Sequence, residues 1–263
     1  MIEKYDIIIQ AGQSNAEGMG MGEVEKEYQP TFRICALSAE KTVEHFPENL
    51  KIVYADKPFD LEIAKEREYQ GGKIADFALP FATLYEKELL DKDRKILIIR
   101  AAVGGSGFKK GQWLPEGVLY LKMLEMVDYA LSLNPQNRVV GFLWHQGEHD
   151  AFEKNPPNRF KEQLKEMIIS FRNHYDLNKL PFIAGDFVNE WKSENLSDCE
   201  PIVNAMKEVV KEIGYGDFIE TSDLKSNNQT LSNGDNIHFC RSAQYVLGQR
   251  YFKAYKKIVI DKG

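Results

Sequence analysis

Four short polar segments of the 263-residue chain hold a hydroxyl, imidazoles, carboxylates and glycine-rich backbone, the groups that hydrolytic chemistry uses. They are residues 11–18 (AGQSNAEG), 103–107 (VGGSG), 145–150 (HQGEHD) and 234–239 (GDNIHF). A serine hydroxyl is a weak nucleophile until a base takes its proton, so a serine and a histidine from different segments would have to meet. Each segment by itself also has an ordinary structural interpretation.

The first segment places Ser14 two residues after Gly12, just behind the strand-like run 5–10. Glycine permits a sharp turn, and a hydroxyl at this point would face the crevice beyond the strand. Taken alone, such a serine is more typical of a helix N-cap, and Asn15 of a turn. The segment does not match the G-x-S-x-G nucleophile elbow, because position 16 is Ala16.

The last segment places Asp235 and His238 three residues apart in a polar loop ahead of the final helix. Folded back together, the carboxylate would accept the Nδ1 proton of the imidazole and leave Nε2 free to act as a base. This spacing is common in loops, so the pair by itself does not indicate a catalytic site.

The second segment, with Gly104 and Gly105, exposes backbone N–H groups that could point at an anion. A phosphate-binding loop is the rival interpretation, but Gly111 is followed by Gln112 rather than by the lysine of a G-K-[ST] ending. Alone, such a run is more typical of a tight turn.

The third segment matches H-x-x-E-H through His145, Glu148 and His149, a zinc pattern that needs both histidines on one helical face. The preceding run 139–144 is typical of a buried strand and Gly147 interrupts the motif, so the context disfavours such a helix. A metal-dependent hydrolase built on these three residues is the alternative function.

Short apolar runs alternate along the chain with segments of helical periodicity, as in a parallel sheet covered by helices. The pattern predicts strands at 5–10, 32–37, 95–101, 138–144, 181–187 and 217–220, helices at 74–90, 117–133, 158–174, 201–213 and 241–258, and loops at 18–29 and 191–199. The polar segments therefore follow strands or precede the last helix. With no repeat and no linker, we expect residues 1–263 to form a single three-layer α/β domain.

The composition limits the classes of partner that the protein could bind. With 34 basic and 40 acidic residues the formal charge is -6, which disfavours binding to nucleic acid or to an anionic membrane. Cys35, Cys199 and Cys240 are odd in number and widely spaced, against a disulfide framework or a zinc ribbon. We expect a cytoplasmic protein, because no signal-peptide pattern and no run of membrane-spanning length is visible. The oligomeric state is left open.

Taken together, the four segments resemble the SGNH hydrolase superfamily, and within it the carbohydrate acetylesterases of the sialate O-acetylesterase and acetylxylan esterase type. The resemblance runs in order from Gly12 to Phe239, through Gly-Gln-Ser-Asn, Gly-Gly-Ser, Trp-His-Gln-Gly-Glu-x-Asp and Asp-x-x-His-Phe. Four blocks in order, each at the right kind of element, are far more specific than any one of them.

The resemblance implies a three-layer flavodoxin-like fold with a central parallel sheet, and a serine esterase that removes O-acetyl groups from carbohydrates without a cofactor or metal. It implies Ser14 as the nucleophile, His238 as the general base and then acid, and Asp235 as the residue that orients His238. An acetyl-serine intermediate follows from these roles.

The resemblance also implies an oxyanion hole made by the backbone N–H of Ser14, a backbone N–H of Gly104 or Gly105, and the side-chain amide of Gln146. The superfamily's name refers to an asparagine in the third block, where this chain has the glutamine of the acetylesterase branch. The segments would be supported by Gln13, Asn15 and Glu148, with Asp150 as a further brace or a less favoured triad acid.

The expected substrate is an acetylated saccharide, either an acetylxylan fragment or an acetylated sialic acid, and its identity and regiochemistry are left open. Four aromatic residues could stack on a sugar or belong to the core: Phe108, Trp113, Tyr120 and Trp191. A non-catalytic sugar-binding module is the remaining alternative.

Overall fold

The apolar run that begins at Tyr5 forms β1 (Tyr5–Gly12), a strand buried along its whole length. It pairs in parallel with β8 (Lys95–Arg100) on one side and with β9 (Arg138–His145) on the other. A strand buried on both faces is predominantly apolar, which explains the continuous Ile7-Ile8-Ile9 run. The first predicted strand thus lies inside the sheet.

The computed structural model describes residues 3–46, 50–69 and 71–261. Within these ranges, seven strands form the central sheet in the order β11-β10-β9-β1-β8-β2-β5. The other strands are β2 (Ile34–Ser38), β5 (Asp60–Ile63), β10 (Phe182–Gly185) and β11 (Gly216–Ile219). Every pairing is parallel except that of β2 with β5.

The strand order contains the flavodoxin-like arrangement. Counted along the chain, β1, β8, β9, β10 and β11 lie in the order 2-1-3-4-5, and β2 and β5 extend the edge beside β8. The predicted fold class, a three-layer fold with a central parallel sheet between helices, is confirmed, with the antiparallel β5 added at one edge. All six predicted strands are present within a few residues of their expected bounds.

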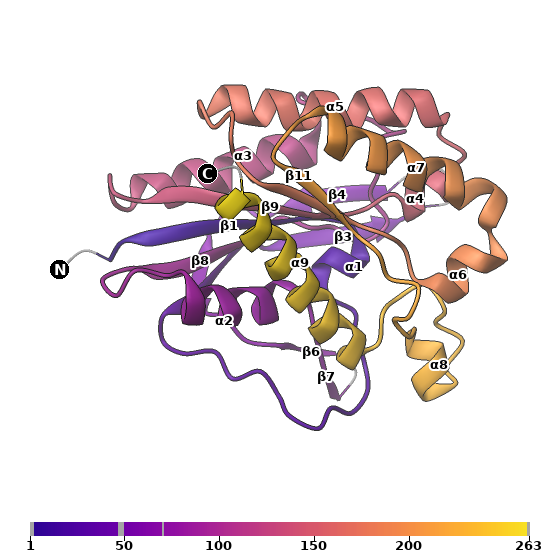
Figure 1. Cartoon of the computed structure of the whole chain (residues 1–263), viewed down its shortest axis with the longest axis horizontal. Helices are drawn as coiled ribbons and strands as arrows, with labels where there is room; N and C mark the ends of the chain where they lie inside the picture. The colour runs from indigo at the N-terminus through magenta and orange to yellow at the C-terminus, as the bar shows by residue number, and fades with distance from the viewer. Residues whose placement is uncertain (1–2, 47–49, 70, 262–263) are drawn as a thin grey trace.

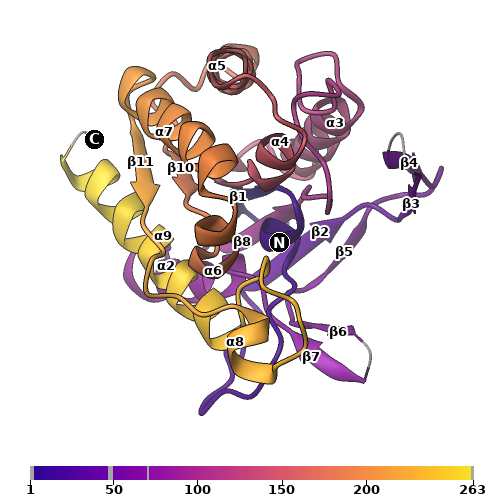
Figure 2. The same cartoon turned by 90° about the vertical axis from the view of Figure 1, so that its right-hand side faces the viewer.

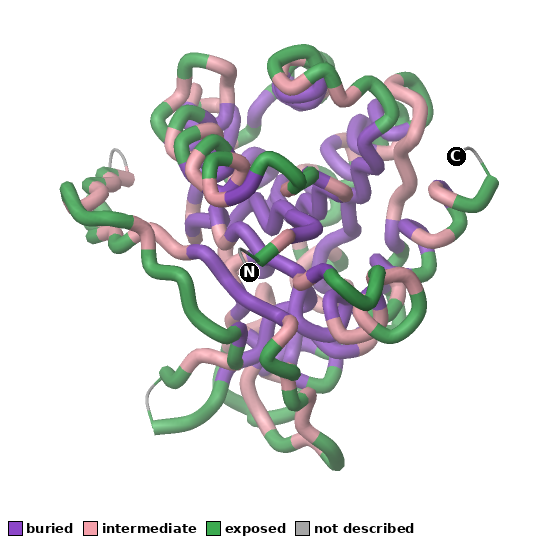
Figure 3. Tube along the Cα trace, turned by 90° about the vertical axis from the view of Figure 1, so that its left-hand side faces the viewer, coloured by how far each residue is buried: buried purple, intermediate pink, exposed green. Residues whose placement is uncertain are grey.

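Helices cover both faces of the sheet (Figure 2). The upper layer in that view holds α3 (Val118–Ser132), α5 (Pro157–His174) and α7 (Leu196–Glu212), and the lower layer holds α2 (Ala78–Glu88) and α9 (Arg241–Asp261). Each layer seals its own apolar core, with Ile7 and Ile9 facing one core and Ile8 the other. The buried residues lie at the centre of the molecule (Figure 3).

Two hairpins outside the central sheet were not predicted. They are β3 (Lys41–His45) with β4 (Leu50–Tyr54), and β6 (Arg67–Tyr69) with β7 (Gly72–Ile74). Their strands are three to five residues long and mostly exposed or half-buried (Figure 3). β3, β6 and β7 lack an apolar run, and the apolar residues of β4 are at most half-buried.

The loop predicted at 191–199 is wrong. Most of this segment is helical, in α6 (Asn189–Glu194) and the first turn of α7. The prediction started the helix at Pro201, from the helical spacing of the apolar residues, whereas α7 begins at Leu196 and contains Pro201 in its interior. Cys199, in the turn before this proline, is buried in the core.

The carboxyl ends of the strands point to the side of the molecule where four short helices gather (Figure 1). These are α1 (Ser14–Glu17), α4 (Glu148–Phe152), α6 and α8 (Asn227–Leu231). None of the described helices is long and apolar enough to cross a bilayer. The three cysteines are buried and unpaired.

Candidate active site

The turn after β1 brings Ser14 to the end of the sheet. Gly12 has φ +128°, and a Cβ added to it would lie 2.1 Å from the carbonyl oxygen of His145 on β9. Only glycine fits between the two strands here. The next N–H, of Gln13, donates to that same carbonyl oxygen at 2.9 Å, and α1 then begins at Ser14.

Ser14, His238 and Asp235 form one hydrogen-bonded chain. The Ser14 Oγ lies 2.8 Å from Nε2 of His238, and Nδ1 of His238 lies 2.9 Å and 3.0 Å from the two carboxylate oxygens of Asp235. A carboxylate can only accept, so Nδ1 carries the hydrogen and Nε2 is left to accept from the serine hydroxyl. This arrangement would let the serine lose its proton to His238.

Asp235 is held in its charged form. Burial opposes ionisation, but the hydrogen bonds from His238 and from Asn227 Nδ2, at 2.8 Å, outweigh it and hold the pKa of Asp235 below its ordinary value. Asn227 belongs to α8, so this short helix fixes the carboxylate behind the imidazole.

Asn15 joins the serine and histidine segments. Its Nδ2 donates to the Ile237 carbonyl at 3.0 Å and to Glu148 at 2.8 Å, and its Oδ1 accepts the N–H of Phe239 at 3.1 Å. The buried Asn15 therefore contacts the chain on both sides of residue 238. Three of the four polar segments meet at this side chain.

Gln13 and Asp150 hold the third segment. The Gln13 Oε1 accepts the backbone N–H of His149 at 3.0 Å, and the buried carboxylate of Asp150 accepts the N–H groups of Phe108 and Lys109 at 2.9 Å each. Asp150 thus ties the third segment to the end of the glycine segment. It has no contact with the triad histidine among the described hydrogen bonds, which agrees with a bracing role.

Gln146 does not lie where an oxyanion donor was expected. It is fully buried, and its Nε2 lies 2.6 Å from Asp150 Oδ2, 3.2 Å from the Ser106 carbonyl and 3.3 Å from Gln13 Oε1. Both of its N–H groups face protein acceptors, one of them charged, so neither is left for a substrate. The motif shows both Gln146 and Asp150, but not the hydrogen bond between them.

The glycine segment lies against Ser14, as expected, and carries a contact that the sequence analysis missed. A Cβ added to Gly104 would lie 3.5 Å from the Ser14 Cβ, and the Gly104 N–H donates to Oε2 of Glu17 at 2.8 Å. The second oxygen of Glu17 lies 3.3 Å from Lys41 Nζ and 3.7 Å from Arg67 Nη1. Only the position of Glu17 inside the first segment could have pointed to it.

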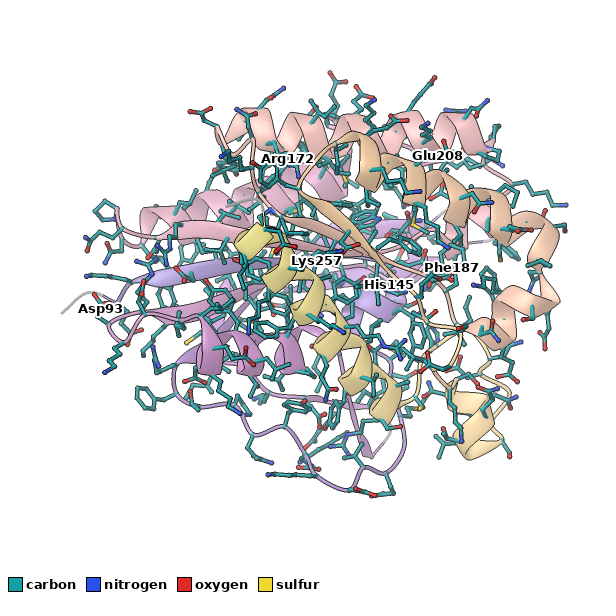
Figure 4. The ribbon with its side chains drawn as sticks, in the orientation of Figure 1. Asp93, His145, Arg172, Phe187, Glu208 and Lys257 are labelled. Carbon is teal, nitrogen blue, oxygen red and sulfur yellow. The ribbon has the colours of Figure 1, made fainter. Side chains whose placement is uncertain are left out.

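His145 is a core residue (Figure 4). Tyr251 donates its hydroxyl hydrogen to the Trp144 carbonyl at 2.7 Å, so the His145 Nδ1, 3.1 Å away, must donate to the tyrosine oxygen. Burial lowers the pKa of His145 to about 3, which keeps the ring neutral. Its Nε2 lies 3.9 Å from Glu148, whose pKa is raised by burial.

The H-x-x-E-H segment is split between two elements, as its context predicted. His145 ends β9, whereas His149 lies on α4 and its Nε2 is 3.8 Å from Glu153. Across the described ranges, no three His, Cys, Asp or Glu side chains are grouped as a metal could use them. This geometry does not favour the metal-dependent alternative.

Three of the four aromatic residues considered for sugar stacking belong to the core. Phe108 and Trp113 are fully buried, and Tyr120 is 2% exposed. The partly buried Trp191 packs against Phe187, with ring centroids 5.8 Å apart. The sequence does not show whether an aromatic side chain faces the core or a ligand.

Comparison with known proteins identifies the family to which the chain belongs. The family model described as "Carbohydrate esterase, sialic acid-specific acetylesterase" matches residues 4–257. The curated Escherichia coli protein "Probable 9-O-acetyl-N-acetylneuraminic acid deacetylase" is 25% identical over 274 residues, which cover 89% of this chain and 82% of that protein.

Solved structures share the fold. The crystal structure of NanS aligns with a TM-score of 0.73 at 20% identity, covering 99% of both chains. A carbohydrate acetylesterase from Xanthomonas citri aligns with a TM-score of 0.66 at 16% identity, covering 98% of this chain and 57% of that one.

Proposed function

The chain belongs to the carbohydrate esterases of the sialic acid-specific acetylesterase family, and we propose that it removes O-acetyl groups from acidic sugars with Ser14 as the nucleophile. The membership makes it a carbohydrate acetylesterase, that is, a carboxylic ester hydrolase, and confirms the resemblance stated from the four segments. The observation that supports the serine mechanism is the contact of 2.8 Å between Ser14 Oγ and His238 Nε2.

In the proposed acylation step, His238 Nε2 takes the hydroxyl proton as Ser14 Oγ attacks the acetyl carbonyl carbon. Asp235 stabilises the imidazolium that forms. The same proton then passes to the sugar oxygen as its bond to the carbonyl carbon breaks. The products of this step are the free sugar hydroxyl and an acetyl-Ser14 ester.

Deacylation repeats the same proton transfers, with water in place of the serine hydroxyl. His238 takes a proton from the water molecule that attacks the acetyl-serine carbonyl, and returns it to Ser14 Oγ as the ester breaks. Acetate leaves and the enzyme is restored. The chain's own side chains supply every proton transfer, so the proposed reaction needs no cofactor.

For the oxyanion of each tetrahedral intermediate we propose the backbone N–H of Ser14 and a backbone N–H of the Gly104–Gly105 pair. No acceptor for the Ser14 N–H occurs among the described hydrogen bonds, and Gly104 adjoins the serine side chain. Gln146 is left out of this set because its donors are bonded within the protein. Its proposed role is to brace the third segment.

The proposed substrate class is an O-acetylated sialic acid rather than an acetylxylan fragment. The family description and the name of the E. coli relative both refer to sialic acids. Acetate release from 9-O-acetyl-N-acetylneuraminic acid should exceed that from acetylated xylo-oligosaccharides at equal concentration. Faster release from the xylo-oligosaccharides would assign the enzyme to the other substrate.

Substitution of the nucleophile tests the mechanism. Ser14→Ala should lower turnover of 4-nitrophenyl acetate about a thousandfold or more, and should abolish labelling by a serine-directed phosphonate. Ser132→Ala, at an exposed position in α3, is the matched control and should keep wild-type activity. Wild-type hydrolysis by Ser14→Ala, or a phosphonate adduct on another serine, would refute the proposal.

A further inference from the structure

Glu17 places a carboxylate on a backbone donor beside Ser14. Its Oε2 accepts the Gly104 N–H at 2.8 Å, and a Cβ built on Gly104 would lie 3.3 Å from that oxygen and 3.5 Å from the Ser14 Cβ. Glu17 belongs to the single turn of helix that begins with Ser14, so the two side chains stay close together. Carboxylate, donor and nucleophile therefore share one small region.

One N–H cannot serve two anions at the same position. A tetrahedral oxyanion bound to Gly104 would take the place of the Glu17 oxygen, and the two negative charges would repel each other at this distance. While Glu17 remains bonded to Gly104, this donor is closed to the reaction.

A second set of partners for the Glu17 carboxylate lies on its other side. Lys41 Nζ is 3.3 Å and Arg67 Nη1 is 3.7 Å from Oε1. Both cations are fixed by other bonds, since Lys41 Nζ donates to the Ala102 carbonyl at 2.7 Å and Arg67 Nη2 to the Glu17 carbonyl at 2.7 Å.

There is room for the side chain to shift toward these cations. A cavity of about 180 Å³ lies behind Glu17, and its lining includes Lys41, Arg67 and Arg100. The cavity adjoins the carboxyl ends of β2 and β8, where Ser38 and Arg100 line it. A carboxylate moved into it would keep its charge compensated.

We propose that Glu17 gates the oxyanion site: it rests with one oxygen on the Gly104 N–H and the other on Lys41 and Arg67, and it leaves Gly104 while keeping both cations when the ester carbonyl enters. The proposal rests on the serine mechanism above and adds a residue that controls access to one of its donors. Lys41 and Arg67 compensate the charge of Glu17 in both positions, and in the open position they are the partners that replace the Gly104 N–H.

Neutralising or shortening Glu17 should open the gate. Glu17→Gln keeps the size of the side chain without its charge, and Glu17→Asp keeps the charge on a shorter stem that no longer reaches Gly104. Both should raise the rate of phosphonate labelling of Ser14, and kcat/KM for 4-nitrophenyl acetate, by about threefold or more. Glu62→Gln, on the exposed strand β5, is the control and should change neither rate.

Removing a cation should lower the labelling rate of Ser14, and should do so only in variants that keep the charge of Glu17. Lys41→Met should slow labelling by about threefold in the wild-type background, and should have no effect in the Glu17→Gln background. A purely structural role for Glu17 would lower the labelling rate in both Glu17 variants.

Two results would overturn the gate: slower labelling in Glu17→Gln and Glu17→Asp, or an equal effect of Lys41→Met in both backgrounds. Thermal unfolding of each variant checks that it is folded. If a Glu17 variant does not fold, the comparison of Lys41→Met with wild type still tests the gate. Ser14→Ala separates the two proposals. If it retains labelling, the serine mechanism fails; if it abolishes labelling while Glu17→Gln slows it, only the gate fails.

Discussion

Asn15 accepts the backbone N–H of Phe239 at 3.1 Å, and through its amide it also donates to the residue on the other side of His238. The residue that follows the proposed nucleophile therefore holds the proposed base in register with it, although 224 positions separate Asn15 and Phe239 along the chain. Asn15 therefore connects the segment of Ser14 directly to the segment of His238.

Asn15→Ala should lower kcat for 4-nitrophenyl acetate by about ten- to a hundredfold with a smaller change in KM, because the imidazole loses its fixed position relative to the hydroxyl. Steady-state kinetics measure both constants. Asn158→Ala, exposed on α5, is the control. Unchanged kcat in Asn15→Ala would show that other contacts are enough to position His238.

Asp235→Asn should lower kcat about a thousandfold or more while the protein stays folded, because an amide no longer fixes the tautomer of His238 or stabilises its positive form. The exposed Asp223→Asn, which loses only a surface pair with Arg250, should keep wild-type kcat. A loss of less than tenfold in Asp235→Asn would argue for another triad acid.

Glu148→Gln should make the protein progressively more stable than wild type as the pH rises. Burial raises the pKa of Glu148, and the hydrogen bond from Asn15 offsets only part of this effect. The folded state therefore binds the Glu148 proton more tightly than the unfolded state, and this stabilisation is lost as the pH rises through the raised pKa. Glutamine keeps an acceptor for Asn15 and carries no charge.

Thermal unfolding of wild type and Glu148→Gln between about pH 5 and about pH 8 checks the sign. The difference in melting temperature should grow in favour of the variant toward the alkaline end. The exposed Glu62→Gln should follow wild type at every pH. A difference that shrinks with rising pH would show that the charged form of Glu148 stabilises the fold.

The central strands and most helices could be read from the sequence because burial imposes a visible pattern. β1 and β9 are apolar along nearly their whole length, and α5 repeats its apolar residues at helical spacing. The hairpins β3–β4 and β6–β7 lie outside the central sheet, and burial imposes no comparable pattern on their mostly exposed or half-buried residues. The cytoplasmic location and the single-domain organisation stay predictions.

The candidate site was likewise predictable only in part. The residue types of the triad and their order along the chain were readable, because each follows a strand or precedes a helix in a recognisable block. The direction of a side chain was not, since it depends on which acceptor lies nearest. Gln146 turns toward Asp150, and Glu17 toward Gly104.

By itself, the sequence determined the layered α/β architecture, the family, and which residues can supply a nucleophile, a base and a carboxylate. These follow from local patterns and from motif order, which need no knowledge of distance. Only the tertiary structure decided that Ser14 and His238 lie 2.8 Å apart, that Gln146 is occupied, and that Glu17 sits on a donor. Hydrogen bonds form at specific distances and angles between atoms far apart in the chain, and only the folded packing sets those.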